Sequence, residues 1–326
     1  MILQNKRLQL TTLWIILSAV LFSLSACTEQ PKTALRIASS PWPGYEPLYL
    51  ARDLGYLNKQ INLFELPSSD ITMESFRNKS TDLATLTLDE TLELIHDGTK
   101  LKILLILDVS HGGDAVLVGP DIKTLADLKG KRISIVNIPL GLYMLNRLLD
   151  KAGLKRSDVT VFPMSESKQE KFHLDGKTDA TITFEPVKTK LIEAGAHVIF
   201  DSSMIPNEIF DLLVAHEEIY QAHKNELCGI ATSWFKSLNY INENKSDAAQ
   251  RITRRLAVGV EDFDSMMDGI ILPTSSINRT FLGGSYPELF EPARRLAEIM
   301  LAEKQLSRLV YINEAIDPVF ANCYSQ

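Results

Sequence analysis

The sequence predicts an α/β protein with two lobes and a helical C-terminal part. Short apolar runs of high β-propensity alternate with segments of helical periodicity, in two successive series divided by His111-Gly112-Gly113. From about Ile219 onward nearly every segment has helical periodicity. At 326 residues the chain is also longer than the roughly 250 to 300 residues at which one hydrophobic core stops growing. We therefore expect two lobes followed by a helical layer.

The first series begins after residue 34. Its expected strands cover 35–38, 61–66, 83–86 and 103–109, and its expected helices cover 46–54, 71–77 and 91–96. Gly55 and Gly98 follow two of these helices, where a C′ glycine is common, and Pro47 and Asp89 suit first-turn and cap positions. This order predicts βαβ units.

The second series repeats the alternation. Its expected strands cover 115–118, 132–136, 159–162, 180–184 and 197–200, and its expected helices cover 140–152, 167–174 and 187–194. A returning strand at 209–215 precedes helices at 227–240, 248–257 and 291–301. The chain therefore crosses between lobes near 108–114 and 201–211, and we expect a hinge there. The predicted lobes are 34–110 plus 206–326, and 111–205.

The N-terminus predicts export. Lys6 and Arg7 precede an apolar run at 13–24, which is too short for a membrane span but typical of a signal peptide, here 1–26. Leu24-Ser25-Ala26-Cys27 resembles the bacterial lipobox, which implies a lipid on Cys27 and a linker through residue 33. The alternative is a plain signal peptide with an incidental cysteine. We expect a protein that is lipid-anchored at a membrane surface facing the periplasm or the cell exterior.

Composition and motifs disfavour several classes of function. The formal net charge is −7 and no basic stripe interleaved with aromatics occurs, which argues against a nucleic-acid partner. Nucleotide-binding glycine motifs, a serine-hydrolase elbow and metal-ligand spacings of cysteine or histidine are missing from the sequence, so we expect no cofactor and no metal. Cys228 and Cys323 form either a disulfide or two small buried apolar positions.

Five segments carry a family resemblance. They are 40–57 (SPWPGYEPLYLARDLGYL), 85–90 (TLTLDE), 107–110 (LDVS), 122–131 (IKTLADLKGK) and 179–186 (DATITFEP). In this order they resemble the ABC-transporter substrate-binding proteins of the nitrate, sulfonate, taurine and thiamine-pyrimidine-precursor branch, over about residues 35–320. The resemblance implies a periplasmic-binding-protein type II fold.

The family resemblance also implies a monomeric, non-enzymatic receptor that captures a small molecule between its lobes and delivers it to an ABC importer. A receptor of the same fold that reports to a membrane sensor protein is the first alternative. A eukaryotic relative in the superfamily is a pyrimidine synthase with closely spaced cysteines. This sequence has no such cysteine cluster, and the enzymatic alternative would use Asp89 and Glu185 as acid and base.

Ligands of open α/β sheets bind beyond the carboxyl ends of the strands and at helix N-termini. The candidate ligand-binding residues lie at such ends or at the crossings, and they are Trp42, Tyr45, Asp89, Glu90, Ser110, Asp114, Leu140, Gly141, Tyr143, Phe184, Glu185 and Asp211. Structural roles remain open for several of them. Trp42, Tyr45 and Tyr143 would also serve as packing residues. Asp89 would serve as a helix N-cap and Glu185 as a partner of a helix dipole, while Ser110 and Asp114 would hydrogen-bond the hinge backbone.

The candidate residues combine carboxylates with aromatic rings. This combination favours a cation or an amino-bearing heteroaromatic ring, such as an aminopyrimidine or a small amine, through charge-assisted hydrogen bonds and cation–π contacts. The alternative is a sulfonate, taurine or nitrate, which backbone N–H groups at 87–90 and 140–143 would bind.

Overall fold

The computed structural model describes residues 34–323. The predicted signal peptide, Cys27 and the linker to residue 33 lie outside the described residues. The described residues from Leu35 onward form one compact unit. Within the described part of the chain, no helix is both long and apolar enough to cross a membrane.

The first sheet has six strands, in the order β11-β4-β10-β3-β1-β2. Their bounds are β1 Leu35–Ser39, β2 Ile61–Glu65, β3 Leu83–Thr87, β4 Leu101–Ser110, β10 Phe210–His216 and β11 Ile270–Ile271. Strand β1 pairs in parallel with β2 and β3, whereas β10 runs antiparallel to β3 and β4. All residues of β3 and β10 are buried, as expected of strands covered on both faces.

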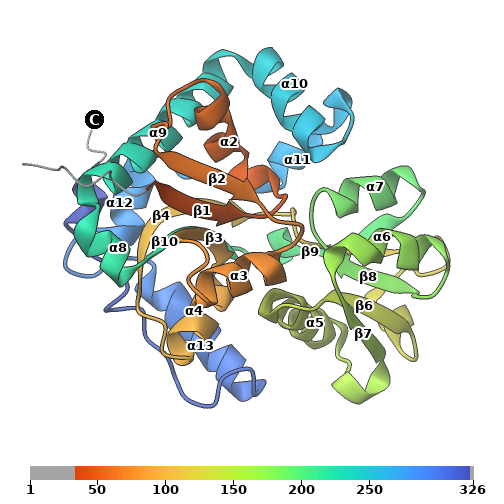
Figure 1. Cartoon of the computed structure of the whole chain (residues 1–326). Helices are drawn as coiled ribbons and strands as arrows, with labels where there is room; N and C mark the ends of the chain where they lie inside the picture. Colours follow the sequence, from red (N-terminus) through yellow and green to blue (C-terminus); the bar gives the residue numbers. More distant parts are fainter. Residues whose placement is uncertain (1–33, 324–326) are drawn as a thin grey trace, which may run out of the picture. The chain divides into compact units, whose positions relative to one another are not determined.

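Helices cover both faces of this sheet (Figure 1). Helix α2 (Glu46–Asp53) lies on one face with α9 (Lys224–Glu243) and α10 (Lys245–Leu256), and α3 (Ser69–Arg77) and α4 (Leu88–His96) lie on the other. The remaining helices of this part are α8 (Glu217–Ala222), α11 (Phe263–Asp268), α12 (Ser275–Leu282) and α13 (Phe290–Ala302), which packs on α4. The predicted helical C-terminal part is confirmed.

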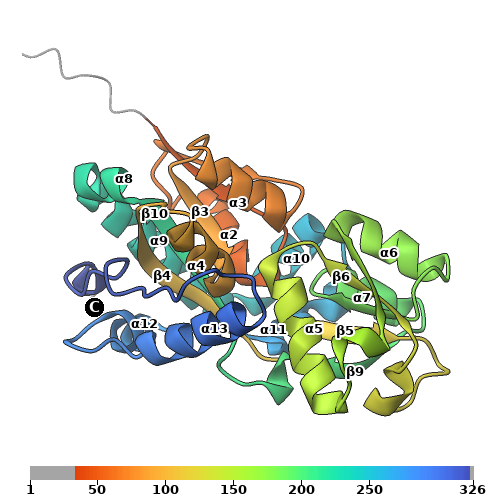
Figure 2. The ribbon, with the colours of Figure 1, turned by 90° about the horizontal axis from the view of Figure 1, so that it is seen from below.

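The second sheet has five strands, in the order β7-β6-β8-β5-β9. Their bounds are β5 Ala115–Val118, β6 Arg132–Val136, β7 Thr160–Met164, β8 Ala180–Thr183 and β9 His197–Asp201. The helices of this lobe are α5 (Pro139–Ala152), α6 (Glu166–Leu174) and α7 (Val187–Glu193). Figure 2, seen from below, separates this lobe from the six-stranded sheet and its helices. The two-lobe α/β architecture is thus confirmed.

The chain passes between the sheets where the sequence predicts, from β4 to β5 and from β9 to β10. The two crossings are hydrogen-bonded to each other. The hydroxyl groups of Ser110 and Ser202 are 2.7 Å apart, and the Gly112 N–H donates to Ser202 Oγ at 2.6 Å. The predicted hinge role of Ser110 agrees with these bonds. Which residues move together as lobes stays a prediction.

Cys228 and Cys323 form a disulfide, with Cα atoms 5.3 Å apart. Of the two alternatives for this pair, the structure therefore has the covalent one. The bond joins α9 to the short C-terminal 3-10 turn at Phe320–Asn322, across a sequence separation of 95 residues.

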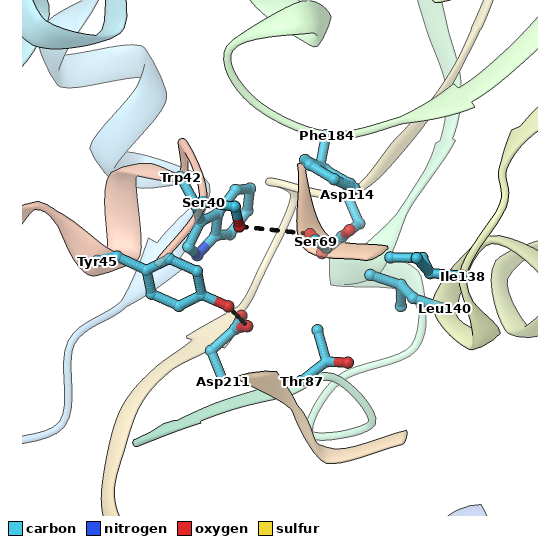
Figure 3. Close-up of a pocket in the computed structure, with 10 residues that line it drawn as sticks. All are labelled: Ser40, Trp42, Tyr45, Ser69, Thr87, Asp114, Ile138, Leu140, Phe184 and Asp211. Carbon is cyan, nitrogen blue, oxygen red and sulfur yellow. Dashed lines mark hydrogen bonds between the residues drawn. The ribbon is translucent and has the colours of Figure 1, made fainter. Parts of the chain in front are cut away.

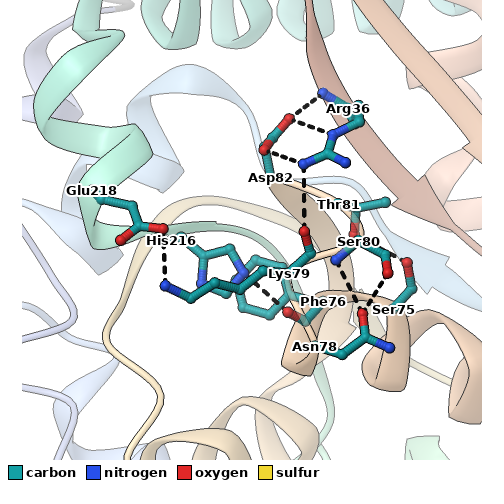
Figure 4. A network of polar contacts seen from close by, with 10 residues as sticks. All are labelled: Arg36, Ser75, Phe76, Asn78, Lys79, Ser80, Thr81, Asp82, His216 and Glu218. Atoms are coloured by element: carbon teal, nitrogen blue, oxygen red, sulfur yellow. Dashed lines mark hydrogen bonds and ion pairs between the residues drawn. The ribbon is translucent and has the colours of Figure 1, made fainter.

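A polar network surrounds the buried end of β10 (Figure 4). The His216 ring stacks on Phe76 with centroids 3.9 Å apart, and its Nε2 lies 3.0 Å from the Phe76 carbonyl oxygen. Desolvation lowers the pKa of His216, as does the nearby charge of Lys79, whereas Glu218, Asp82 and the hydrogen bond to Phe76 oppose this shift. Burial therefore favours the neutral ring.

Candidate functional site

A cavity lies where loops from both lobes meet (Figure 3). Its lining residues are Ser40, Trp42, Tyr45, Ser69, Thr87, Asp114, Ile138, Leu140, Phe184 and Asp211. Most of them end or follow β1, β3, β6 and β8 or begin α3, in agreement with the rule that ligands bind beyond the carboxyl ends of strands and at helix N-termini, called the strand-end rule below. Asp114 precedes β5 and Asp211 is the second residue of β10, so these two lie at the crossings between the sheets. The cavity holds about 20 Å³, which is room for about one water molecule. The two lobes therefore approach closely around it.

Trp42 is held by the loop that contains it. Pro43–Tyr45 forms a 3-10 turn directly after Trp42, and the Trp42 Nε1–H donates to Asp108 Oδ2 at 2.8 Å. A Cβ on Gly44 would lie only 1.7 Å from the same oxygen. Glycine is therefore needed here because the loop passes close to the Asp108 carboxyl group.

Trp42 also contacts the opposite lobe. Its ring meets Phe184, which follows β8, edge to face with centroids 5.8 Å apart and an interplanar angle of 90°. This is a favourable aromatic geometry. Both rings line the cavity, so the contact forms one wall of the site across the two lobes.

Asp108 and Asp211 form a buried acid pair at the edge of the cavity. They are directly opposite each other in the register of the antiparallel strands β4 and β10, and Asp108 Oδ1 is buried without a hydrogen-bond partner. The Tyr45 hydroxyl donates to Asp211 Oδ1. Burial raises the pKa of Asp211 well above its usual value and that of Asp108 to about 7. The pair therefore favours a state with at least one proton.

Three further buried acids surround this pair. Burial raises the pKa of Asp114 to about 7 and that of Asp89 to about 6. Burial, followed by the charge of Asp89, raises the pKa of Glu90 well above its usual value. The carboxyl of Asp89 interacts electrostatically with both Asp114 and Asp211, and its Oδ2 is buried without a hydrogen-bond partner.

The start of α4 corrects one structural expectation for Asp89. The N-cap is Thr87, whose Oγ1 accepts from the Glu90 N–H while Glu90 Oε2 accepts from the Thr87 N–H at 2.9 Å. Asp89 lies in the first turn, so the N-cap interpretation was wrong. The reciprocal pairing of Thr87 and Glu90 gives Glu90 a structural role.

Glu185 also has a structural partner. Its Oε2 accepts from the Thr189 N–H at 3.0 Å near the start of α7, and its Oε1 lies 3.3 Å from Lys188 Nζ. Glu185 is buried but does not line the cavity. These contacts are those of a carboxylate that stabilises a helix N-terminus, the alternative left open for this residue.

The candidates on α5 separate into two groups. Leu140 lines the cavity. Gly141 packs on Val136, because a Cβ there would lie 2.1 Å from the Val136 carbonyl oxygen. The Tyr143 hydroxyl donates to Glu208, which also pairs with Arg147 at 2.8 Å. Neither Gly141 nor Tyr143 lines the cavity.

Half of the predicted site residues therefore line the cavity, and they are Trp42, Tyr45, Asp114, Leu140, Phe184 and Asp211. The sequence reasoning did not single out Ser40, Ser69 and Ile138, which also line it. Ser40 directly follows β1 and Ile138 lies two residues after β6, so the strand-end rule could have predicted both. Ser69 begins α3, and the same rule covers helix N-termini, but the predicted helix began only at residue 71.

Basic groups are scarce near this cluster. Lys188 lowers the pKa of Asp114 through its charge, but it is paired with Glu185. Across residues 34–323, the structure has no group of three or more histidine, cysteine or acidic side chains arranged to hold a metal ion. The site is thus an acidic and aromatic cavity.

A sequence model described as "NMT1/THI5 like" matches residues 42–248, more than half of the chain. The chain belongs to the NMT1/THI5-like family. The match includes the Trp-Pro-Gly-Tyr loop, the acid pair and both crossings. A search of curated proteins finds no significant match.

Solved structures share the fold. The alkanesulfonate-binding protein SsuA from Xanthomonas axonopodis pv. citri, bound to MOPS, is similar with a TM-score of 0.73 and 17% identity, over 87% of this chain and 98% of that one. The periplasmic aliphatic sulphonate binding protein SsuA from Escherichia coli has the same TM-score and identity, over 88% and 92%. A zinc-bound ligand-binding component of an ABC-type import system from Staphylococcus aureus has a TM-score of 0.74 and 11% identity, over 88% and 97%. The fold is that of the type II periplasmic binding proteins.

Proposed function

We propose that this protein is an extracytoplasmic, non-enzymatic solute-binding protein that captures a small molecule between its lobes and delivers it to an ABC importer. Family membership supports this proposal, as do the names of the similar structures, which are binding proteins and an import component. The main observation in support of the proposal is the cavity, which is lined by strand ends of both lobes. A site shared by two lobes suits capture by closure.

The lining of this cavity favours a ligand with a positive charge or amino groups, such as an aminopyrimidine or a small amine, which would enter when the lobes open. The acids Asp114 and Asp211 line the cavity, and Asp89 interacts with both. Ionised carboxylates accept charge-assisted hydrogen bonds from such groups. The faces of Trp42 and Phe184 add aromatic surface, where each cation–π contact contributes about 0.5 to 2 kcal/mol.

A sulfonate, taurine or nitrate is the second candidate ligand class. The two SsuA proteins named above are sulfonate-binding, and this favours an anion by analogy of fold. The buried acids oppose it, because an anion beside Asp114 and Asp211 would be repelled unless both carboxyl groups were protonated.

Calorimetric titration with an aminopyrimidine, propylamine, taurine and nitrate distinguishes the two classes. We expect binding of at least one amine, weakened about tenfold or more in Asp114→Asn, since a charge-assisted bond contributes about 1.5 to 3 kcal/mol. Glu46→Gln is the matched control, because Glu46 is equally buried but pairs with Arg255 on α10, outside the cavity. Tight taurine or nitrate binding that Asp114→Asn leaves unchanged would contradict the cationic assignment.

Anchoring through Cys27 is part of the proposal and rests on the lipobox resemblance. Cys27→Ser protein is expected to leave the membrane fraction while keeping its ligand affinity, because residue 27 precedes the compact unit. If this variant still sediments with membranes after a high-salt wash, the tether lies elsewhere. The alternative to an importer is a membrane sensor as the partner. Transport assays with an ABC permease encoded beside this protein separate the two.

The lobes 34–110 plus 206–326 and 111–205 are proposed to move as rigid bodies about the two crossings. Ligand binding shifts the protein toward the closed form only by its differential affinity for that form. Solution scattering is expected to show a smaller radius of gyration at saturating ligand. An unchanged curve with binding confirmed would argue against lobe closure.

A further inference from the structure

The buried pair Asp108 and Asp211 has an arrangement that two ionised carboxylates do not tolerate. The two residues lie directly opposite each other on β4 and β10, and Asp108 Oδ1 is buried without a hydrogen-bond partner. Both side chains are almost inaccessible to water. Two like charges in such contact cannot both be present without strong repulsion. One proton shared by the two groups removes this repulsion, and the unpartnered Asp108 Oδ1 is an atom that could carry it.

Two neutral side chains donate hydrogen bonds to the pair. Trp42 Nε1–H donates to Asp108 and the Tyr45 hydroxyl donates to Asp211. These donors stabilise one negative charge shared by the pair, but they do not neutralise a second. Asp211 also lines the cavity, whereas Asp108 lies behind it in contact with Trp42. A ligand therefore reaches the pair on the Asp211 side.

We propose that Asp108 and Asp211 hold one shared proton in the ligand-free protein and release it to solvent when the positively charged group of a ligand binds beside Asp211, so that the pair selects ligands by charge. This proposal rests on the proposed function and deepens it. The exchange is balanced: one proton leaves and one positive charge enters, while no covalent bond other than O–H is broken. An anionic or neutral ligand cannot make this exchange.

Most of the other titratable groups around the pair are acids. The groups that face it are Tyr45 on the 3-10 turn, Asp89 and Glu90 on α4, Asp114 just before β5, and Lys188 on α7 through its effect on Asp114. The acids raise the pKa values within the cluster, whereas the hydrogen bond from Tyr45 lowers that of Asp211. A second sign of a ligand is the buried Asp89 Oδ2, which has no partner and interacts with the cavity-lining Asp114 and Asp211.

The test is calorimetric titration with propylamine in buffers of different ionisation enthalpy. An alkylamine keeps its own charge up to about pH 9, so any proton released comes from the protein. We expect release of about one proton per ligand near neutral pH. The affinity should rise up to about tenfold per pH unit below the pair's pKa.

Two variants of the pair and its donor separate this mechanism from a structural role. In Asp211→Asn the proton release and the pH slope should fall sharply, while Glu46→Gln, a buried acid outside the cavity, should keep both. In Tyr45→Phe the release should persist with its pH midpoint moved upward, because the donor that favours ionised Asp211 is gone. This second variant serves if Asp211→Asn does not fold.

Infrared spectroscopy gives a readout without any ligand. A carbonyl band of a protonated carboxyl group is expected in ligand-free protein at neutral pH, changed in Asp211→Asn and retained in Glu46→Gln. If propylamine binds without proton release in wild-type protein, the exchange is wrong although the cationic function stands. If taurine or nitrate binds and the amines do not, both the function and the exchange are wrong.

Discussion

Gly44→Ala is expected to damage the site and the fold together. The added Cβ would lie 1.7 Å from Asp108 Oδ2 and 2.5 Å from Trp42 Nε1, whereas ordinary contacts of a Cβ begin at 3.4 Å. Asp108 is fully buried and cannot swing into solvent. The loop must therefore move and break the hydrogen bond between Trp42 and Asp108. Overpacking costs about 1 to 3 kcal/mol, and loss of a bond to a carboxyl group about 1.5 to 3 kcal/mol.

We therefore expect Gly44→Ala to lower the free energy of unfolding by roughly 2.5 to 6 kcal/mol in urea titrations and to weaken ligand binding more than tenfold. Gly229→Ala is the control. Gly229 lies inside α9 with nothing within 4 Å of the position of its Cβ, so alanine there should be neutral or stabilising by up to about 1 kcal/mol. Wild-type stability and affinity in Gly44→Ala would refute the close approach of this loop to Asp108.

Three further predictions concern the disulfide, the lobe contact and the buried histidine. Replacing Cys228 and Cys323 with serine should lower the free energy of unfolding by about 2 to 5 kcal/mol, measured by urea titration, with ligand affinity unchanged because neither residue lines the cavity. Phe184→Ala should weaken ligand binding about two- to twelvefold in calorimetry, since an aromatic pair contributes about 0.5 to 1.5 kcal/mol beyond its buried area, while Phe172→Ala on the outer helix α6 should not. The pKa of His216 is lowered in the folded protein, so its stabilising contribution is present above the unfolded value of about 6.5 and is lost as the pH falls below it. In urea titrations, the free energy of unfolding of His216→Gln should therefore fall less between neutral and acid pH than that of the wild-type protein. An equal fall in both proteins would contradict burial of the neutral ring.

The sequence was sufficient for the architecture because local signals and the global fold agree. Alternating apolar runs predicted both βαβ series, and the strands at 115–118 and 132–136 have those bounds in the structure. Gly55 and Gly98 have positive φ after their helices, as C′ glycines should. The two-residue strand β11 was missed because so short an element has no periodicity of its own.

The site was predicted less completely because burial and pairing depend on tertiary structure. The strand-end rule placed Trp42 and Phe184 correctly at the cavity, and the predicted crossing placed Asp211 there. It did not reveal that Asp108 and Asp211 oppose each other, because their register depends on the pairing of β4 with β10, about 100 residues apart in the chain. It also assigned Tyr143 to the ligand, whereas the structure shows its hydroxyl donating to Glu208.

Mass spectrometry of the small molecules released when the purified protein is denatured tests the central proposal most directly. If an acidic and aromatic cavity between the lobes captures a cation, the protein should release a basic nitrogen compound in amounts close to one per chain. The Asp114→Asn variant, which changes a cavity-lining acid, should release much less of it. Release of a sulfonate or another anion in equal amounts from both proteins would contradict the account.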